Sequence, residues 1–251
     1  GGPDTAIFLS NFSDPNVANG GPSLQPTGGN PGGFLQVTNN VNGQSNYGAF
    51  AQTDAASAAA TFTFQFRIDN LGANGADGIS FILLPTATFG TTGSIANPNI
   101  APEDPLVAGA LGFGFDTWGN AAPVDYVNPG ELGPNYSEIS LFYNGALISR
   151  IDDTRTLTPS LNIKDGAWHT VTGDINFQST LVSMNVDGNP MFSGEPVAGL
   201  APYDSRVVFG GRTGGANERA SIDNLNVQFV PEPGIIGAVA FGGLLLGRRR
   251  R

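Results

Sequence analysis

The sequence predicts an all-β fold, an antiparallel sandwich or jelly roll, from three observations. The 251 residues include 36 Gly and 18 Pro, and only 13% of them are charged, against roughly 25% in ordinary domains. Roughly ten short apolar segments are separated by turn residues. Only residues 54–60 hint at a helix, and this helix is short, so no helical crossovers connect the strands. Many short antiparallel strands joined by tight turns are therefore expected.

Two segments give the clearest strand patterns. Apolar side chains occupy every second position of 61–68, which predicts a strand with one buried face. Residues 79–84 form a nearly continuous apolar run that ends at Pro85, as in a strand covered on both sides. The remaining predicted strands are 33–38, 111–115, 138–143, 146–151, 168–175, 181–186, 206–209 and 221–229.

Turn residues separate several of these strands and mark hairpins. Gly145 and the group 187–190, Asp-Gly-Asn-Pro, predict turns between paired strands. No linker precedes Val230 and no internal repeat is visible, so residues 1–229 are expected to form one domain. At the start of strand 168–175, Trp168 is expected in the core and His169 on the solvent side.

Composition and charge exclude several classes of function. The net charge is −10; removing residues 231–251 takes away four Arg and one Glu, and leaves 7 basic against 20 acidic residues, or −13. Such a body repels nucleic acid and anionic lipid but is compatible with cation binding. Without Cys neither a disulfide nor a thiolate zinc site can form, and a single His169 removes most His-dependent catalysis from consideration.

The segment 115–120, Phe-Asp-Thr-Trp-Gly-Asn, carries the clearest candidate chemistry. Asp116, Asn120 and the later Asp125 place oxygen-bearing side chains close together. Ca²⁺ prefers several carboxylate, amide and carbonyl oxygens, and Trp118 offers a flat apolar face that suits a sugar ring. The alternative is that Asp116 and Asn120 cap a turn, since both residue types favour such positions.

The tripeptide Ala76-Asp77-Gly78 precedes the apolar strand 79–84. Together with the segment 115–120, it resembles the L-type (legume-lectin-like) lectin family. The resemblance extends more weakly to the Trp-His pair at 168–169 and to the Gly-rich loop before the last strand. It implies a concanavalin A-like jelly roll that binds carbohydrate.

The resemblance also implies a calcium site and a sugar site that share residues. The implied calcium ligands are the side chains of Asp116, Asn120 and Asp125 and the backbone carbonyl of Trp118. The implied sugar contacts come from Asp77, Trp118, Asn120, Gly214 and Gly215. In this arrangement Asp77 follows a cis peptide bond from Ala76 and accepts hydrogen bonds from sugar hydroxyls, while Trp118 stacks on the pyranose ring.

Two departures from the family pattern change the expected metal content. Legume members carry a Glu two residues before the Asp and a His downstream, both ligands of a second, transition metal. Here the first position is Gly114 and no His lies near Asp125, so Ca²⁺ alone is expected. A further family contact is a backbone N–H of a Gly between the two motifs, for which Gly90 and Gly93 are candidates.

The C-terminal segment 230–251 has three parts in a fixed order. Val-Pro-Glu-Pro at 230–233 precedes the apolar stretch 234–247 and the four Arg of 248–251. This order resembles a PEP-CTERM sorting signal, whose apolar part is a short hydrophobic helix. The resemblance implies a bacterial protein that an exosortase processes during export, with 234–247 transiently in the inner membrane. An ordinary C-terminal membrane anchor is the alternative, and both place the body outside the cytoplasm.

The sequence thus predicts a calcium-dependent carbohydrate-binding protein that is secreted or held at the bacterial cell surface or in the extracellular matrix. The alternative is a structural matrix or filament protein, a homo-oligomer that uses the lectin-like sandwich as a scaffold. No enzyme is predicted, because no strand carries the paired carboxylates of a glycosidase. The Gly-rich loop 210–215 lacks the Gly-Lys-Ser/Thr ending of a phosphate loop.

Overall fold

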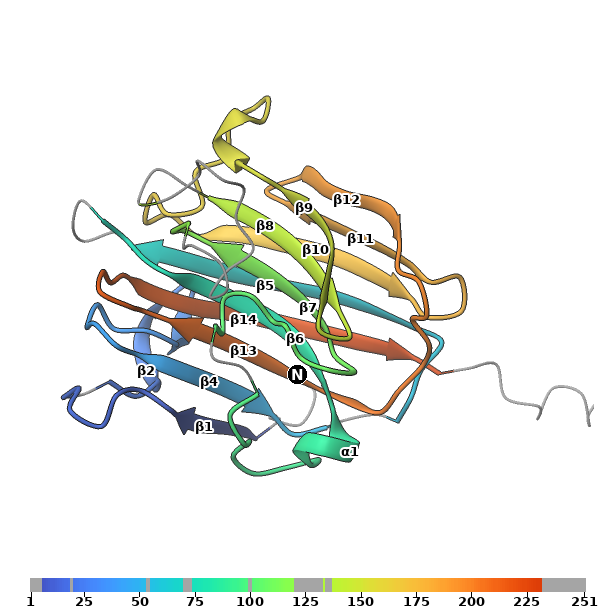
Figure 1. Ribbon diagram of the computed structural model, residues 1–251, viewed down its shortest axis with the longest axis horizontal. Coiled ribbons are helices and arrows are strands. Elements are labelled where there is room, and N and C mark those ends of the chain that lie inside the picture. The colour runs from blue at the N-terminus through green and yellow to red at the C-terminus, as the bar shows by residue number, and fades with distance from the viewer. Residues whose placement is uncertain are drawn as a thin grey trace, which may run out of the picture.

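A computed structural model describes residues 6–18, 20–52, 55–69, 74–98, 101–119, 133 and 137–231. These residues form two seven-stranded sheets stacked face to face (Figure 1). In spatial order the first sheet contains β1 (Ile7–Asn11), β4 (Ser45–Phe50), β13 (Ser205–Arg212), β6 (Gly78–Pro85), β7 (Leu111–Asp116), β8 (Glu138–Tyr143) and β9 (Ala146–Ile151). The second contains β12 (Asn189–Pro196), β11 (Leu181–Val186), β10 (His169–Asn176), β5 (Ala59–Asp69), β14 (Arg219–Val230), β3 (Gly32–Gln36) and β2 (Ser23–Gly29). The predicted antiparallel sandwich is confirmed.

The main core lies between the two sheets and is rich in Phe. The predicted alternation of β5 is confirmed, since its Phe side chains point inward and its polar ones outward. Phe62 packs against Phe81 of β6 with ring centroids 4.9 Å apart, and Phe64 packs against Phe209 of β13 at 5.0 Å. Each fully buried side chain of this size contributes roughly 1.5–3 kcal/mol through the apolar area it removes from water.

Strand β6 is buried on both faces, as its continuous apolar run predicts. Its Ile79, Phe81 and Leu83 face the main core. Its Ile82 and Leu84 belong to a second apolar cluster, which also contains Ile95, Val107 and Ala110 from the segment after β6. This segment therefore covers the outer face of the first sheet.

Four strands were not predicted, namely β1, β2, β4 and β12. Strand β4 lacks the apolar alternation because small and polar residues point inward. A Cβ on Gly48 would lie 2.6 Å from Leu35 Cδ2, so the close packing there excludes a side chain. The buried Asn46 side chain donates to the carbonyls of Gly20 and Val37. These contacts depend on residues far away in the sequence.

The predicted helix at 54–60 is wrong within the described residues. Residues 59–60 begin β5, and 55–58 are not helical. Ala58 accepts a hydrogen bond from Phe177 N and donates one to Val230 O, so sheet-like pairing overrides the local alanine propensity. The described helices are α1 (Thr86–Phe89) and the 3₁₀ turn η1 (Thr154–Thr156); none of them is long and apolar enough to cross a membrane.

The predicted hairpin turns are confirmed. Asn144 and Gly145 join β8 to β9 with φ of 51° and 76°, and Asp187 and Gly188 join β11 to β12 with φ of 51° and 78°. Positive φ at both central residues is the requirement of a two-residue hairpin turn. The last two residues of the predicted turn 187–190, Asn189 and Pro190, are instead the first residues of β12.

The two expectations for the start of β10 are wrong. His169 is buried rather than solvent-facing, because its Nδ1 lies 2.7 Å from Asp187 Oδ2 and its Nε2 lies 3.2 Å from Asp165 Oδ1. Trp168 is only half-buried and lies 4.6 Å from the Arg67 guanidinium. The predicted tail segment 232–251, with its apolar stretch, lies outside the described residues.

Candidate functional site

Antiparallel pairing places the two sequence motifs side by side at one end of the sandwich. Gly78, at the start of β6, pairs with Asp116, at the end of β7. Thr117 N donates to Asp77 O at 2.9 Å, and Asp77 N donates to Arg212 O at 3.0 Å. The turn before β6, the loop after β7 and the end of β13 are thus joined through their backbones.

Asp77 stands at the centre of this arrangement and is only 3% exposed. Its peptide bond to Ala76 is cis, as the family resemblance implies. The next residue, Gly78, has φ of +140°, and a Cβ there would lie 2.3 Å from Phe115 O. Only glycine fits this turn, because a side chain would collide with the β7 backbone.

The loop after β7 begins with a local turn that orients Trp118. Asp116 is buried, and its Oδ1 accepts a hydrogen bond from Trp118 N at 2.7 Å. The Trp118 side chain is half-exposed. Thr117, which lies between Asp116 and Trp118, makes two further contacts. Its hydroxyl donates to Glu218 Oε2 at 2.8 Å, and its carbonyl accepts from Lys164 Nζ.

The predicted calcium ligands are only partly described. Asp116 supplies a carboxylate and Trp118 a backbone carbonyl, both hard oxygen donors of the kind Ca²⁺ takes. Asn120 and Asp125 lie outside the described residues. Within the described ranges, no group of three His, Cys, Asp or Glu side chains is arranged to hold a metal ion. The oxygen chemistry present fits Ca²⁺ but forms half of the implied ligand set.

A hollow of about 480 Å³ opens beside Asp77. Its lining combines a carboxylate, a guanidinium, an amide, an indole and small residues: Asn74, Asp77, Trp118, Arg212, Gly214, Gly215 and Ala216. The predicted sugar contacts Asp77, Trp118, Gly214 and Gly215 therefore meet in one pocket. Sequence reasoning missed Asn74, Arg212 and Ala216. A signal for Arg212 was present, since it is the single cation of the Gly-rich loop 210–215.

Two loop glycines line this pocket, and at one of them a side chain would crowd Asp77. A Cβ on Gly214 would lie 3.0 Å from Asp77 Oδ2, whereas a Cβ on Gly215 would meet nothing within 4 Å. The turn before β4 holds the loop that contains these two glycines. Gly43 N donates to Gly214 O at 3.0 Å, and Asn42 Nδ2 donates to Gly215 O at 3.0 Å. The loop thus places bare backbone, rather than a side chain, next to the Asp77 carboxylate.

Two buried glutamates lie around the site. Burial raises the pKa of Glu103 to about 7, although the Arg212 guanidinium opposes the shift. Burial likewise raises the pKa of Glu218 to about 8, against the hydrogen bond from Thr117 and the charge of Lys164. Burial lowers the pKa of Arg212, but the Glu103 carboxylate more than offsets this, and the net pKa is raised. Both carboxyl groups therefore change protonation near neutral pH.

Gly90 and Gly93 are not part of the site. Gly90 ends α1, which follows the far end of β6. The carbonyl of Gly93 accepts from Arg206 Nη2 at 3.0 Å, and Arg206 pairs with Leu84, again at that far end. The expected contact fails because the loop after β6 begins at the end of the strand opposite the pocket.

The position of Gly114 has a packing reason. A Cβ there would lie 2.4 Å from Glu103 O, so no glutamate side chain could stand at this position.

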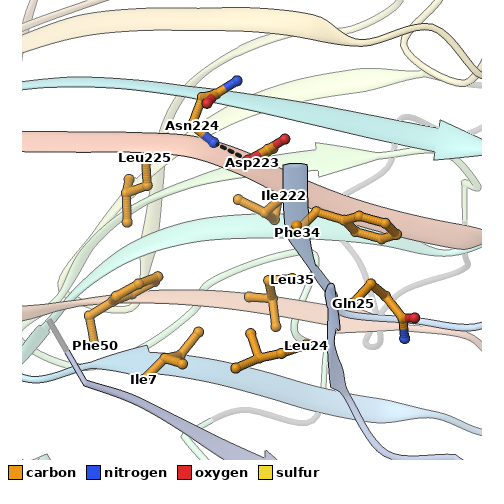
Figure 2. Close-up of a pocket in the computed structure, with 11 residues that line it drawn as sticks. Ile7, Leu24, Gln25, Phe34, Leu35, Phe50, Ile222, Asp223, Asn224 and Leu225 are labelled. Carbon is orange, nitrogen blue, oxygen red and sulfur yellow. Dashed lines mark hydrogen bonds between the residues drawn. The ribbon is translucent and has the colours of Figure 1, made fainter. Parts of the chain in front are cut away.

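A second hollow, of about 340 Å³, lies between the edges of the two sheets and is mainly apolar. Figure 2 shows Ile7, Leu24, Leu35 and Phe50 around it. Of its polar groups, Asp223 Oδ2 already accepts from Asn30 N, and Asn224 Nδ2 donates to Asn30 O. The lining of this hollow is mainly apolar, whereas the hollow at Asp77 contains the side chains of both sequence motifs, so the pocket at Asp77 is the candidate site.

Solved structures match most of the chain, although no protein-family profile and no curated protein sequence matches it. The lectin from Bauhinia forficata in complex with GalNAc superposes with a TM-score of 0.57 at 16% identity, over 88% of this chain and 97% of that one. The chain has the fold of the legume lectins. Lectin II from Ulex europaeus gives 0.56 at 15% identity, over 89% and 92% of the two chains.

The structure of VIP36 is a further match. The exoplasmic/lumenal domain of VIP36, in its Ca²⁺- and Man3GlcNAc-bound form, superposes on this chain with a TM-score of 0.55 at 11% identity, over 91% of this chain and 87% of that one. These likenesses confirm the concanavalin A-like jelly roll expected from the two sequence motifs. At such identities they establish the fold alone.

Proposed function

We propose that this chain is a calcium-dependent carbohydrate-binding protein whose ligand occupies the pocket around Asp77. The observation that carries the proposal is the meeting of Asp77, Trp118 and Gly214 at one hollow of a lectin fold. A sugar ring has hydroxyls around its rim and C–H groups on its faces. The carboxylate accepts hydrogen bonds from the hydroxyls, and the half-exposed indole packs against a face.

A calcium ion is part of the proposal. Asp116, the Trp118 carbonyl, Asn120 and Asp125 are its proposed ligands, and Ca²⁺ alone is proposed. Asn120 is proposed to contact the sugar as well. Support comes from the oxygen chemistry of Asp116 and Trp118 and from the neighbour VIP36, whose structure is Ca²⁺-bound. The metal would order the loop that presents the indole.

Export to the cell surface or extracellular matrix of a bacterium is proposed with this function. The support is the order of the three parts of 230–251, which suits exosortase processing and a transient stay of 234–247 in the inner membrane. Retention of the chain in the cytoplasm after cell fractionation would contradict it.

A glycan array probed with and without a Ca²⁺ chelator tests the function. Wild-type protein should bind a subset of glycans in Ca²⁺ and lose that binding in chelator. Replacing Asp77 with Ala should lower the affinity at least roughly tenfold, since a buried carboxylate pairing with hydroxyls is worth about 1.5–3 kcal/mol per bond. Asp174, an exposed residue of β10, provides the matched control variant Asp174→Ala, which should bind as wild type does.

The outcome that contradicts the function is equally concrete. If no glycan is bound, and the Asp77→Ala and Asn120→Ala variants behave like wild type in every assay, sugar binding is refuted. Filaments or sheets in electron micrographs would then favour the structural matrix protein.

A further inference from the structure

Arg212 is placed at the pocket by an ion pair that uses only part of its guanidinium. Its Nε donates to Glu103 Oε1 at 2.6 Å, and its Nη2 donates to the same oxygen. Nη1 has no hydrogen-bond partner among the described residues, and the side chain, which is 15% exposed, lines the hollow. One edge of the guanidinium is thus held by Glu103, while Nη1 is left for a further acceptor.

Glu103 is itself fixed by the segment 101–107, which packs on the outer face of the first sheet. Its backbone carbonyl lies over Gly114, and Pro105 lies over Gly112, where a Cβ would be 2.7 Å from Pro105 Cγ. Ser80 of β6 donates to the carbonyl of Pro102. The Glu103 side chain is fully buried, so it holds Arg212 from a rigid position.

Arg212 also lies beside the proposed ligand-binding carboxylate. Its Nε is 3.6 Å from Asp77 Oδ2. The pocket wall therefore presents a carboxylate and a guanidinium next to each other. A ligand that pairs with both must carry a hydrogen-bond donor and an acceptor on neighbouring atoms. Two adjacent hydroxyls of a pyranose meet this requirement, since each hydroxyl can donate and accept.

We propose that Arg212 is a specificity-determining residue of the pocket, which donates from Nη1 to a sugar oxygen adjacent to the hydroxyl bound by Asp77. Glu103 is its positioning residue. The proposal rests on the proposed function and adds to it a ligand class, sugars with two free neighbouring hydroxyls. Neither residue belongs to the contacts implied by the sequence motifs.

A purely structural role for Arg212 makes a different prediction. In that case the guanidinium serves only to neutralise the buried Glu103. Removing Arg212 alone would then leave the buried Glu103 carboxylate without its counter-charge. The fold would be destabilised independently of any effect on ligand affinity. The double variant Glu103→Gln/Arg212→Gln avoids this problem because it removes both charges. The matched control is Asp69→Asn/Arg219→Gln, which removes an ion pair of 2.7 Å that does not line the pocket.

The test is calorimetric titration of the full chain in Ca²⁺ with the methyl glycosides of galactose, mannose and glucose and their monodeoxy derivatives. For the best parent glycoside, one deoxy derivative should bind wild type about tenfold more weakly, the factor expected of one hydrogen bond. The double variant should bind that parent about tenfold more weakly than wild type does and should no longer distinguish the two sugars. The control pair should behave as wild type, and thermal melts should show both variants folded.

Two results distinguish a failure of the proposed function from a failure of the proposed role of Arg212. If wild type binds none of the parent glycosides, the sugar-binding function itself is contradicted and the role of Arg212 falls with it. If wild type binds a parent glycoside but the folded double variant binds and discriminates equally well, only the role of Arg212 is overturned. Partial rescue by Arg212→Lys, which keeps the charge but not the planar fork, further supports direct donation.

Discussion

At the scale of single residues, the pocket depends on where side chains are absent as much as on where they are present. Gly78 admits the backbone of β7 at the turn that carries Asp77, and Gly214 keeps side-chain atoms away from the Asp77 carboxylate. The matched neighbour Gly215 has free space around it. These two adjacent glycines provide a test of access that does not touch any charged group.

Gly214→Ala should lower sugar affinity about tenfold, whereas Gly215→Ala should change it less than about twofold. The reason is that the new methyl group of Gly214→Ala would press on Asp77 Oδ2 at 3.0 Å, and that of Gly215→Ala would contact nothing. Neither glycine has a positive φ, so both variants should fold. Isothermal titration with the best methyl glycoside measures the difference. Equal affinities for the two variants would contradict the position assigned to the ligand.

At the scale of elements, buried hydrogen bonds connect loops from different strands around the site. Glu218, between β13 and β14, accepts from Thr117 in the loop after β7, and Lys164, before β10, donates to the same residue. Glu103, from the segment before β7, reaches the end of β13. The site is thus held by contacts among loops that lie far apart in the sequence.

Glu218 predicts a pH dependence of stability. Burial raises its pKa from 4.5 to about 8, so the folded chain binds this proton more tightly than the unfolded chain. Its contribution is fully present below about pH 4.5 and is lost as the pH rises through about 8. In chelator, the melting temperature should therefore fall between about pH 5 and pH 8 and level off above that range.

Glu218→Gln should reduce that fall roughly by half, because Glu103, with a pKa raised to about 7, continues to contribute in the same direction. Differential scanning calorimetry across the pH range measures the effect. The exposed control Asp174→Asn should keep the wild-type profile. Identical profiles for wild type and Glu218→Gln would show that Glu218 does not take up a proton in this range.

At the scale of the whole molecule, two stacked sheets with a Phe-rich core hold the loops of the site. The ends of β7 and β13 and the start of β6 meet at one end because these neighbours are antiparallel. The chain is acidic overall, with a net charge of −10, so binding a cation also relieves repulsion between carboxylates. Metal binding at one end should consequently stabilise the entire domain.

Excess chelator should lower the melting temperature by about 5–10 °C, since a ligand present at 100 times its Kd stabilises the native state by about 2.7 kcal/mol. Asp116→Asn should abolish the Ca²⁺-dependent shift, and Asp174→Asn should retain it. Thermal melts with and without Ca²⁺ measure both. A wild-type melting temperature that is the same in Ca²⁺ and in chelator would refute the calcium site.

Much of the fold follows from local sequence patterns. The alternation of β5, the continuous apolar run of β6 and the Gly-containing hairpin turns are properties of neighbouring residues, so they could be predicted without tertiary information. Strand β4 could not, because its inward Asn46 and Gly48 become favourable only against Gly20, Val37 and Leu35. The predicted helix at 54–60 failed for the same reason, since pairing with distant strands overrode alanine propensity.

The sequence by itself determined that the chain is an all-β sandwich and that Asp77, Asp116 and Trp118 belong to candidate binding motifs. Only the tertiary structure decided that these motifs share one pocket, that Gly90 and Gly93 lie away from it, and that Arg212 faces the ligand space with Glu103 behind it. The physical reason is that strand periodicity and turn preferences act between neighbouring residues. The pairing of buried charges and the approach of loops depend instead on which strands lie side by side.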